Sequence, residues 1–177
     1  RVLTILSSEA SCLNSKMPAG TTPAALPLSS GNVTCATATG SAYLNNGRFK
    51  SVLVGQTIAL GLNMRNSSGL SGLTLAGNKL ITAKASSCVN GAPIPNSQRT
   101  FCIPYNVWNY LSTPKTVANL YTLANQALGG NTPVGLTISD INAAVDAINQ
   151  AFDQCRILVS FGTCNNDDDD DCCCQRN

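Results

Sequence analysis

The chain of 177 residues contains no histidine, and its single glutamate is Glu9. The absence of histidine excludes the Ser-His-Asp and Cys-His arrangements of hydrolases, histidine zinc sites and histidine-ligated haem. The sequence also lacks the Gly-x-Ser-x-Gly, Walker and Gly-x-Gly-x-x-Gly motifs. Together these absences predict that the protein is not an enzyme.

Carboxylates that could act as a catalytic pair are few. Asp140, Asp146 and Asp153 fall on one predicted helix, and the last two are seven positions apart, on the same face. A paired-carboxylate glycosidase site could be built in this way. Because this face also carries Asn149 and lies away from the apolar stripe, we interpret it as the solvated face of the helix.

Charged residues make up only 11% of the chain, and their signs are unevenly distributed. Up to residue 166, ten lysines and arginines stand against four acids, a net charge of +6, whereas residues 167–177 carry five aspartates and one arginine, a net charge of −4. The basic residues form no run, which argues against nucleic-acid binding. No apolar run approaches the roughly 18 residues that a membrane span requires.

Nine cysteines are present, and none forms a Cys-x-x-Cys pair. This spacing predicts disulfides and an oxidising compartment rather than a zinc site, with buried apolar thiols as the alternative. We expect neighbours in the sequence to pair, each bond stabilising the fold by roughly 2–4 kcal/mol. The odd count leaves one thiol free, bonded to another chain or bound to another group. The expected pairs are Cys12–Cys35, Cys88–Cys102 and Cys155–Cys164, and the other cysteines are Cys172, Cys173 and Cys174.

Serine, threonine, asparagine, glycine and alanine take the place of charged residues, as is common in secreted proteins. Two sequons, at Asn32 and Asn66, are candidate N-glycosylation sites, with chance matches as the alternative. The chain begins at Arg1 without an initiator methionine, which predicts a processed chain or a fragment. The expected location is extracellular, secreted or at the cell surface.

The clearest periodicity begins at residue 113 and predicts two amphipathic helices. Thr113-Pro114 is expected to start the first helix and Gly129-Gly130 to end it. Thr137 or Ser139 is expected to cap the second helix. The residues expected to face inward are Val117, Leu120, Leu123 (or Ala124), Leu128, Ile141, Val145, Ile148 and Phe152.

Elsewhere the patterns are shorter. Residues 1–6 and 32–39 read as β-type runs, and residues 7–31 as a loop-like segment containing three prolines. Residues 49–65 fit either a helix or an alternating strand, and their length favours the helix. The remaining expected elements are strands at 73–75 and 79–83 joined by a Gly77-Asn78 turn, a helix at 104–111 and a strand at 156–161.

These elements predict an α+β fold in which a helical hairpin and a longer helix pack on a small β-sheet, stapled by disulfides. Three regions are expected along the chain. They are an N-terminal extended segment at 1–31, a globular α+β domain at 32–164 and an acidic cysteine-rich tail at 165–177.

Six stretches also carry a family likeness. They are Arg-Phe-Lys at 48–50, Val-Gly-Gln-Thr-Ile-Ala-Leu-Gly-Leu-Asn at 54–63, Gly-Leu-Ser-Gly-Leu-Thr-Leu at 69–75, Asn-Val-Trp-Asn-Tyr-Leu at 106–111, and the helix patterns at 116–130 and 136–149. Together they resemble an uncharacterised module of large secreted cell-surface or adhesin proteins of Bacteroidota-type bacteria. The resemblance implies an extracellular, adhesin-like or matrix protein and transfers no catalytic residue.

The tail contains a run of five carboxylates whose mutual repulsion must be relieved by water or by a partner. Hard oxygen ligands suit Ca²⁺, although the run lacks the alternation and the glycine of an EF-hand loop. A connector to a basic surface and an unspecific acidic tail are the alternatives. The candidate calcium ligands are Asp167, Asp168, Asp169, Asp170 and Asp171.

The odd cysteine count, the +6 and −4 charge split and the low-charge surface favour a structural function. We expect an extracellular subunit of a cell-surface or matrix fibre or filament, self-assembled by non-covalent contacts and by disulfides. The alternative is a monomeric calcium- or carbohydrate-binding adhesin module, whose partner would be a surface glycan. No cofactor other than Ca²⁺ is expected.

Overall fold

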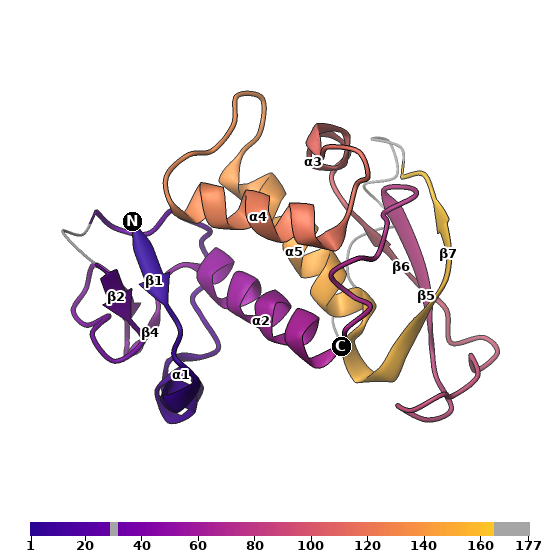
Figure 1. Ribbon diagram of the computed structural model, residues 1–177, viewed down its shortest axis with the longest axis horizontal. Helices are drawn as coiled ribbons and strands as arrows, with labels where there is room; N and C mark the ends of the chain where they lie inside the picture. The colour runs from indigo at the N-terminus through magenta and orange to yellow at the C-terminus, as the bar shows by residue number, and fades with distance from the viewer. Residues whose placement is uncertain (29–31, 165–177) are drawn as a thin grey trace.

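The computed structural model describes residues 1–28 and 32–164 of the chain. It has the predicted α+β class, with three long helices lying between N-terminal elements and a three-stranded sheet (Figure 1). The helices are α1 (Ala10–Lys16), α2 (Val52–Asn66), α3 (Tyr105–Tyr110), α4 (Val117–Leu128) and α5 (Ile138–Ala151), with the short 3-10 turns η1 (Ser7–Glu9) and η2 (Asp153–Cys155). The strands are β1 (Val2–Thr4), β2 (Asn32–Thr34), β3 (Leu44–Asn45), β4 (Arg48–Phe49), β5 (Lys79–Lys84), β6 (Arg99–Cys102) and β7 (Arg156–Gly162).

Helices α2, α4 and α5 form the central layer and contact one another pairwise. α4 and α5 each bury an apolar stripe at three-to-four spacing, as the sequence predicts. The helical interpretation of residues 49–65 is also confirmed, because α2 is helical from Val52 to Asn66. Each large aliphatic side chain buried in this layer stabilises the fold by about 1.5–3 kcal/mol. The fully buried members include Leu53, Leu60, Leu120, Ile141, Val145 and Ile148.

The ends of the hairpin helices are set by caps, and one predicted cap is wrong. α4 begins at Val117 instead of at Thr113-Pro114, because the Thr116 hydroxyl accepts the hydrogen bond of the Asn119 N–H. The Asn119 side chain in turn donates to the Pro114 carbonyl at 2.8 Å and holds the preceding residues in a turn. Gly129 is the C-cap, as predicted, and Thr137 caps α5 in a capping box with Asp140.

The main sheet has the order β6-β5-β7, and both strand pairs are antiparallel. The predicted strand at 156–161 is confirmed as β7. The predicted pairing of 73–75 with 79–83 is wrong, because Thr74 forms an isolated bridge with Thr116 and the neighbours of β5 come from 99–102 and 156–162. The short helix predicted at 104–111 is confirmed as α3, and it follows β6, a strand that is not predicted from the sequence.

The N-terminal part is more structured than the sequence indicates. β1 pairs in parallel with β2, and the loop predicted over 7–31 is wrong at Ala10–Lys16, which forms α1. Leu26 is buried, and its N–H donates to the Leu128 carbonyl at the end of α4 at 2.9 Å. Residues 1–28 therefore pack onto the helical layer.

Three disulfides join the six described cysteines, and two of the three predicted partnerships are wrong. Cys12–Cys35 is confirmed, but Cys88 pairs with Cys155 and Cys102 pairs with Cys164. Asn78 explains why Cys102 pairs with Cys164. Its side chain donates a hydrogen bond to the Cys164 carbonyl and accepts one from the Cys164 N–H. These bonds lead the chain after β7 across the start of β5 toward β6. The N–H of Ala85 donates to the Cys155 carbonyl and brings that residue to the loop that carries Cys88.

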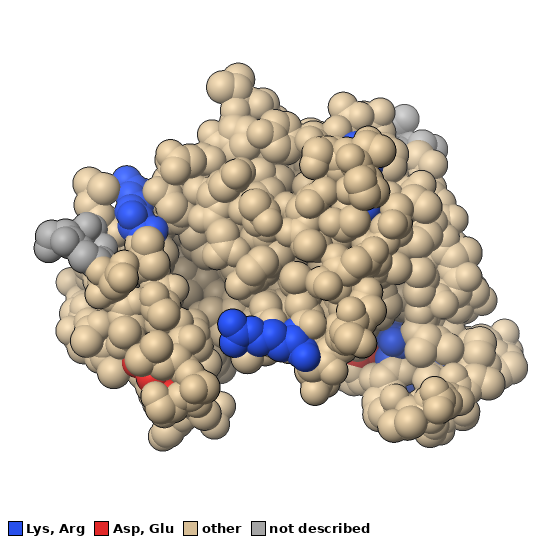
Figure 2. Space-filling view, viewed as in Figure 1, with Lys and Arg blue, Asp and Glu red and all other residues tan. Residues whose placement is uncertain are grey.

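The surface carries few charges. Figure 2 shows isolated positive and negative side chains separated by wide uncharged areas. Within residues 1–28 and 32–164, no helix is long and apolar enough to cross a membrane.

Candidate ligand-binding groove

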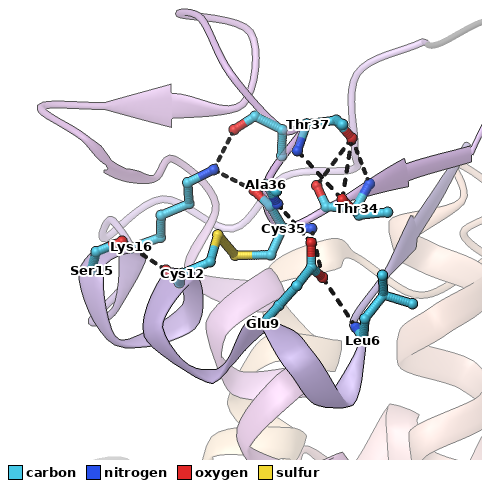
Figure 3. The surroundings of a disulfide bond; sticks show 10 residues. Leu6, Glu9, Cys12, Ser15, Lys16, Thr34, Cys35, Ala36 and Thr37 are labelled. Atoms are coloured by element: carbon cyan, nitrogen blue, oxygen red, sulfur yellow. Dashed lines mark hydrogen bonds between the residues drawn. A yellow bond between two sulfur atoms is a disulfide. The ribbon is translucent and has the colours of Figure 1, made fainter.

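The N-terminal elements are held together by a buried carboxylate. Glu9, 8% exposed, accepts hydrogen bonds from the backbone N–H groups of Ala36 at 2.9 Å, Leu6 at 3.1 Å and Cys35 at 3.2 Å (Figure 3). The bond from Ala36, helped by those from Leu6, Thr34 and Cys35, outweighs burial and lowers the pKa of Glu9 from 4.5 to about 2. The carboxylate therefore stays charged and joins η1 to the turn after β2.

A buried lysine and the first disulfide complete this connection. The ammonium group of Lys16 donates to the carbonyls of Cys35 and Ala38 and lies 5.8 Å from the centre of the Phe49 ring. Cys12 on α1 is bonded to Cys35 beside it (Figure 3). α1 is thus fixed to residues 34–38 by one covalent bond and by charged hydrogen bonds on both sides of it.

With α1 fixed, the segment from β1 to α1 lies across α2 and leaves a groove of two lobes between them. The larger lobe has a volume of about 470 Å³ and lies between β1, α2 and the end of α4. Its lining residues are Arg1–Ile5, Leu26, Val54, Thr57, Ile58, Gly61, Leu62, Arg65, Tyr121, Asn125, Leu128 and Gly129.

The smaller lobe has a volume of about 380 Å³ and lies between η1, α1 and α2. It shares Ile5, Ile58, Leu62 and Arg65 with the larger lobe, so the two lobes are adjacent. Its other lining residues are Leu6, Ser7, Ala10, Leu13, Asn14, Met17 and Ala59. Each lobe lies in the range of about 300–1,000 Å³ that small-molecule sites occupy.

The polar groups of the groove are unevenly placed. Thr57, Gly61 and Arg65 follow one another at four-residue spacing and form one stripe of α2, facing the larger lobe. The Tyr121 ring lies over Gly61, because a Cβ atom at Gly61 would lie 2.9 Å from its hydroxyl oxygen. The Thr57 hydroxyl is buried without a hydrogen-bond partner in the described part of the chain. No acidic residue lines either lobe, so Arg1 and Arg65 make the groove positive.

The two carboxylates that the sequence offered as a catalytic pair, Asp146 and Asp153, do not share a helix. α5 ends at Ala151, and Asp153 lies in η2, where its carboxylate accepts a hydrogen bond from the Gln154 N–H. Both aspartates of α5 have structural partners instead. Asp140 is in the α5 cap; burial opposes its charge, but the hydrogen bonds from Asn106 and Thr137 prevail and lower its pKa. Burial raises the pKa of Asp146 in spite of hydrogen bonds from Gln150 and Gln56. The expectation that Asp146 points into solvent is therefore wrong, since α2 covers it.

The other predicted sites fall in different places. Asn32 and Asn66, the candidate glycosylation residues, are both exposed, at the start of β2 and at the end of α2. The candidate calcium ligands Asp167–Asp171 lie outside the described residues. Over 1–28 and 32–164 there is no group of three or more cysteines, aspartates or glutamates that could hold a metal ion.

The groove is not evident from the sequence, because the composition of residues 7–31 indicates a loop where α1 forms one of its walls. The available signal was the apolar spacing of Leu6, Ala10, Leu13 and Met17, which fits a helix over 6–17. A cationic Arg65 on the otherwise apolar stripe of Ile58 and Leu62 was the second signal. Neither indicates which helix the segment will lie against.

Comparisons with protein-family models, with curated proteins and with solved structures find no match to this chain.

Proposed function

We propose that the protein is an extracellular structural subunit, without catalytic activity, whose copies are joined through the C-terminal cysteines. The observation that supports this proposal is the use of cysteine in the described fold. All six cysteines between residues 1 and 164 are consumed by three disulfides within the chain. Disulfides of this kind are typical of proteins that fold in an oxidising compartment.

The remaining cysteines are Cys172, Cys173 and Cys174. Three is an odd number, so at least one of them has no cysteine partner within residues 1–177 whatever the other two do. In an oxidising compartment that thiol is available to a second chain. Two thiols on two chains then lose two protons and two electrons, one S–S bond forms, and a small disulfide such as oxidised glutathione is reduced to two thiols.

The charge distribution supports the same role. Aspartates at 167–171 immediately precede the cysteines, and the rest of the chain is positive. A negative segment is attracted to the positive body of a neighbouring copy, and the attraction falls as salt is added. The sparsely charged surface offers little repulsion between copies (Figure 2).

The test is an oxidation experiment on the full chain in a glutathione redox buffer, read by non-reducing electrophoresis and intact mass. We expect disulfide-linked dimers and larger species that disappear on reduction and in the variant with Cys172→Ser, Cys173→Ser and Cys174→Ser. The matched control replaces three polar neighbours, Asn165→Ser, Asn166→Ser and Gln175→Ser, and should keep the linked species.

A chain that remains monomeric under these conditions, with one titratable thiol per molecule, would remove the covalent part of the proposal. Sedimentation velocity at low and high salt tests the non-covalent part. A single monomer boundary at both salt concentrations would remove that part as well.

A monomeric carbohydrate-binding module is the second candidate, and one surface feature favours it. A shallow cleft of about 250 Å³ beside α3 and α4 has no charged residue; its lining is Tyr110, Leu111, Ser112, Asn119, Thr122, Leu123 and Gln126. An exposed aromatic ring among neutral hydroxyls and amides suits the apolar face and the hydroxyls of a sugar. The control is Tyr105, whose side chain is as exposed as that of Tyr110 (50% and 51%). This module would be favoured if saccharide binding is lost in Tyr110→Ala and kept in Tyr105→Ala. Calcium titration of the same proteins tests the acidic run.

A further inference from the structure

The two lobes of the groove differ in chemistry, and we propose that together they bind one medium-chain fatty acid. Its carboxylate would lie in the larger lobe, at Arg65, and its alkyl chain in the smaller lobe, between α1 and α2. This inference concerns a site lined by residues between 1 and 129 and does not depend on the proposed joining of copies through the C-terminal cysteines.

The head of the ligand is identified by the polar groups of the larger lobe. Arg65 lies one helical turn after Gly61, and the Tyr121 hydroxyl lies above Gly61. A guanidinium and a phenol that line the same lobe are suited to a carboxylate, which can accept two hydrogen bonds from the guanidinium fork and a third from the hydroxyl. Because no acid lines the groove, no carboxylate of its wall competes for Arg65.

The body of the ligand is identified by the smaller lobe. Leu13 and Met17 line it from α1 and its C-cap, and Ile58 and Leu62 line it from α2. The full lining includes only two uncharged polar residues, Ser7 and Asn14. A lobe of about 380 Å³ with apolar walls suits an unbranched alkyl chain. Leu6 and Leu62 are 45% and 49% exposed, and an alkyl chain between them would remove that apolar surface from water.

The connection between the lobes fixes the orientation. Arg65 contributes to both lobes, and so do Ile5, Ile58 and Leu62. A ligand that places its anion at Arg65 can therefore run directly past Leu62 into the smaller lobe. This geometry selects a molecule with one anionic end and a long apolar body over a short anion or a neutral hydrocarbon.

The experiment is calorimetric titration of the full chain with octanoate, decanoate and dodecanoate below their critical micelle concentrations. We expect 1:1 binding that tightens by up to about fourfold for each methylene added while the chain still lies inside the lobe. Dodecanol, with the same chain and no charge, should bind at least about tenfold more weakly, because it forms no charged hydrogen bonds.

Three variants test the assignment of the lobes, two of them with matched controls. Arg65→Gln should weaken dodecanoate binding about tenfold or more and leave dodecanol unchanged, whereas Arg48→Gln, at an exposed arginine outside the groove, should change neither. Tyr121→Phe should weaken dodecanoate binding several-fold, and Tyr110→Phe should not. Ala59→Phe, which fills the smaller lobe, should remove the gain between octanoate and dodecanoate. Thermal melts of each variant confirm that the fold is retained.

Several results would overturn the proposal. The anionic head is wrong if dodecanol binds as tightly as dodecanoate or if Arg48→Gln weakens binding as much as Arg65→Gln. The alkyl site is wrong if chain length has no effect, and the site itself is wrong if no heat is detected with any of the three acids. A change in sedimentation caused by Ala59→Phe would assign the groove to a second copy of the chain instead.

Discussion

The two disulfides of the sheet enclose overlapping stretches of chain, and this overlap predicts how their contributions to stability combine. Cys88–Cys155 and Cys102–Cys164 span 67 and 62 positions. Taken alone, each would lower the entropy of the unfolded chain enough to stabilise the fold by about 4.3 kcal/mol. They are not alone, because residues 102–155 lie inside both loops.

The overlap shortens the loop that the second bond closes. When Cys88–Cys155 is intact, the unfolded chain can be traced from Cys102 to Cys164 across that bond, through 14 positions on one side and 9 on the other. A loop of roughly 23 positions contributes about 3.4 kcal/mol. The same loop applies when the bonds exchange roles. We therefore expect loss of either bond to cost about 3.4 kcal/mol, and loss of the remaining bond to cost about 4.3 kcal/mol.

The measurement is denaturant unfolding followed by far-ultraviolet circular dichroism, on the pair variants Cys88→Ala with Cys155→Ala and Cys102→Ala with Cys164→Ala, and on the variant lacking both bonds. All proteins should carry serine at 172–174, so that no tail thiol pairs with the cysteines under test. Sulfate in the buffer raises the stability of the least stable variant into the measurable range.

A first and a second removal of equal cost would refute the overlap, because the loops would then act independently. Costs below about 1 kcal/mol for each removal would refute the assumption that the bonds act through the unfolded chain. Intact-mass measurement confirms which bonds each variant contains.

Three further predictions concern single side chains. The pKa of Glu9 is lowered from 4.5 to about 2 in the folded protein, so its contribution to stability should be complete above pH 4.5 and be lost as the pH falls toward 2. In thermal melts, the melting temperature of Glu9→Gln should not show this decrease between pH 4.5 and 2. Thr137→Ala should lower the free energy of unfolding by about 0.5–2 kcal/mol because it removes the α5 cap, and Ser139→Ala, inside the helix, should not lower it. Thr57→Val removes a buried hydroxyl that has no described partner, so the melting temperature should rise; a fall would mean that the hydroxyl is hydrogen-bonded.

Local signals made the helical part of the fold predictable. The apolar stripes of α4 and α5 repeat over three turns or more. Residues with a clear capping role mark a boundary of each helix: Gly129 follows the end of α4, and Thr137 precedes the start of α5. The one wrong boundary had a competing local signal, since Thr113-Pro114 and Thr116 can each start a helix. The hydrogen bond from Asn119 to the Pro114 carbonyl decided between them, and it is visible only in three dimensions.

Long-range order was less accessible from the sequence, and the disulfides show why. Cys12–Cys35 was predicted because nearness in sequence happens to coincide with the pairing of β1 and β2. Cys102 meets Cys164 because β5 lies between β6 and β7 and because Asn78 directs the chain after β7 toward β6. Neither the strand order nor the role of Asn78 is encoded in cysteine spacing. The groove was unpredictable for the same reason, since it needs α1 and α2 to be placed side by side.

The two proposals depend on different residues of the chain, and this separation keeps their tests independent. The groove lies between the N-terminal elements and α2, while Cys164, the last described residue, is bonded to the end of β6 in the sheet on the other side of the helical layer (Figure 1). The long helices between them are packed through fully buried side chains such as Leu60, Leu120 and Ile148. A rigid layer of this kind keeps a change on the sheet side of the molecule from reshaping the groove. The chain with serine at 172–174 should therefore bind dodecanoate as the natural chain does, and Arg65→Gln should leave disulfide-linked association unchanged. Failure of one proposal would thus leave the other standing.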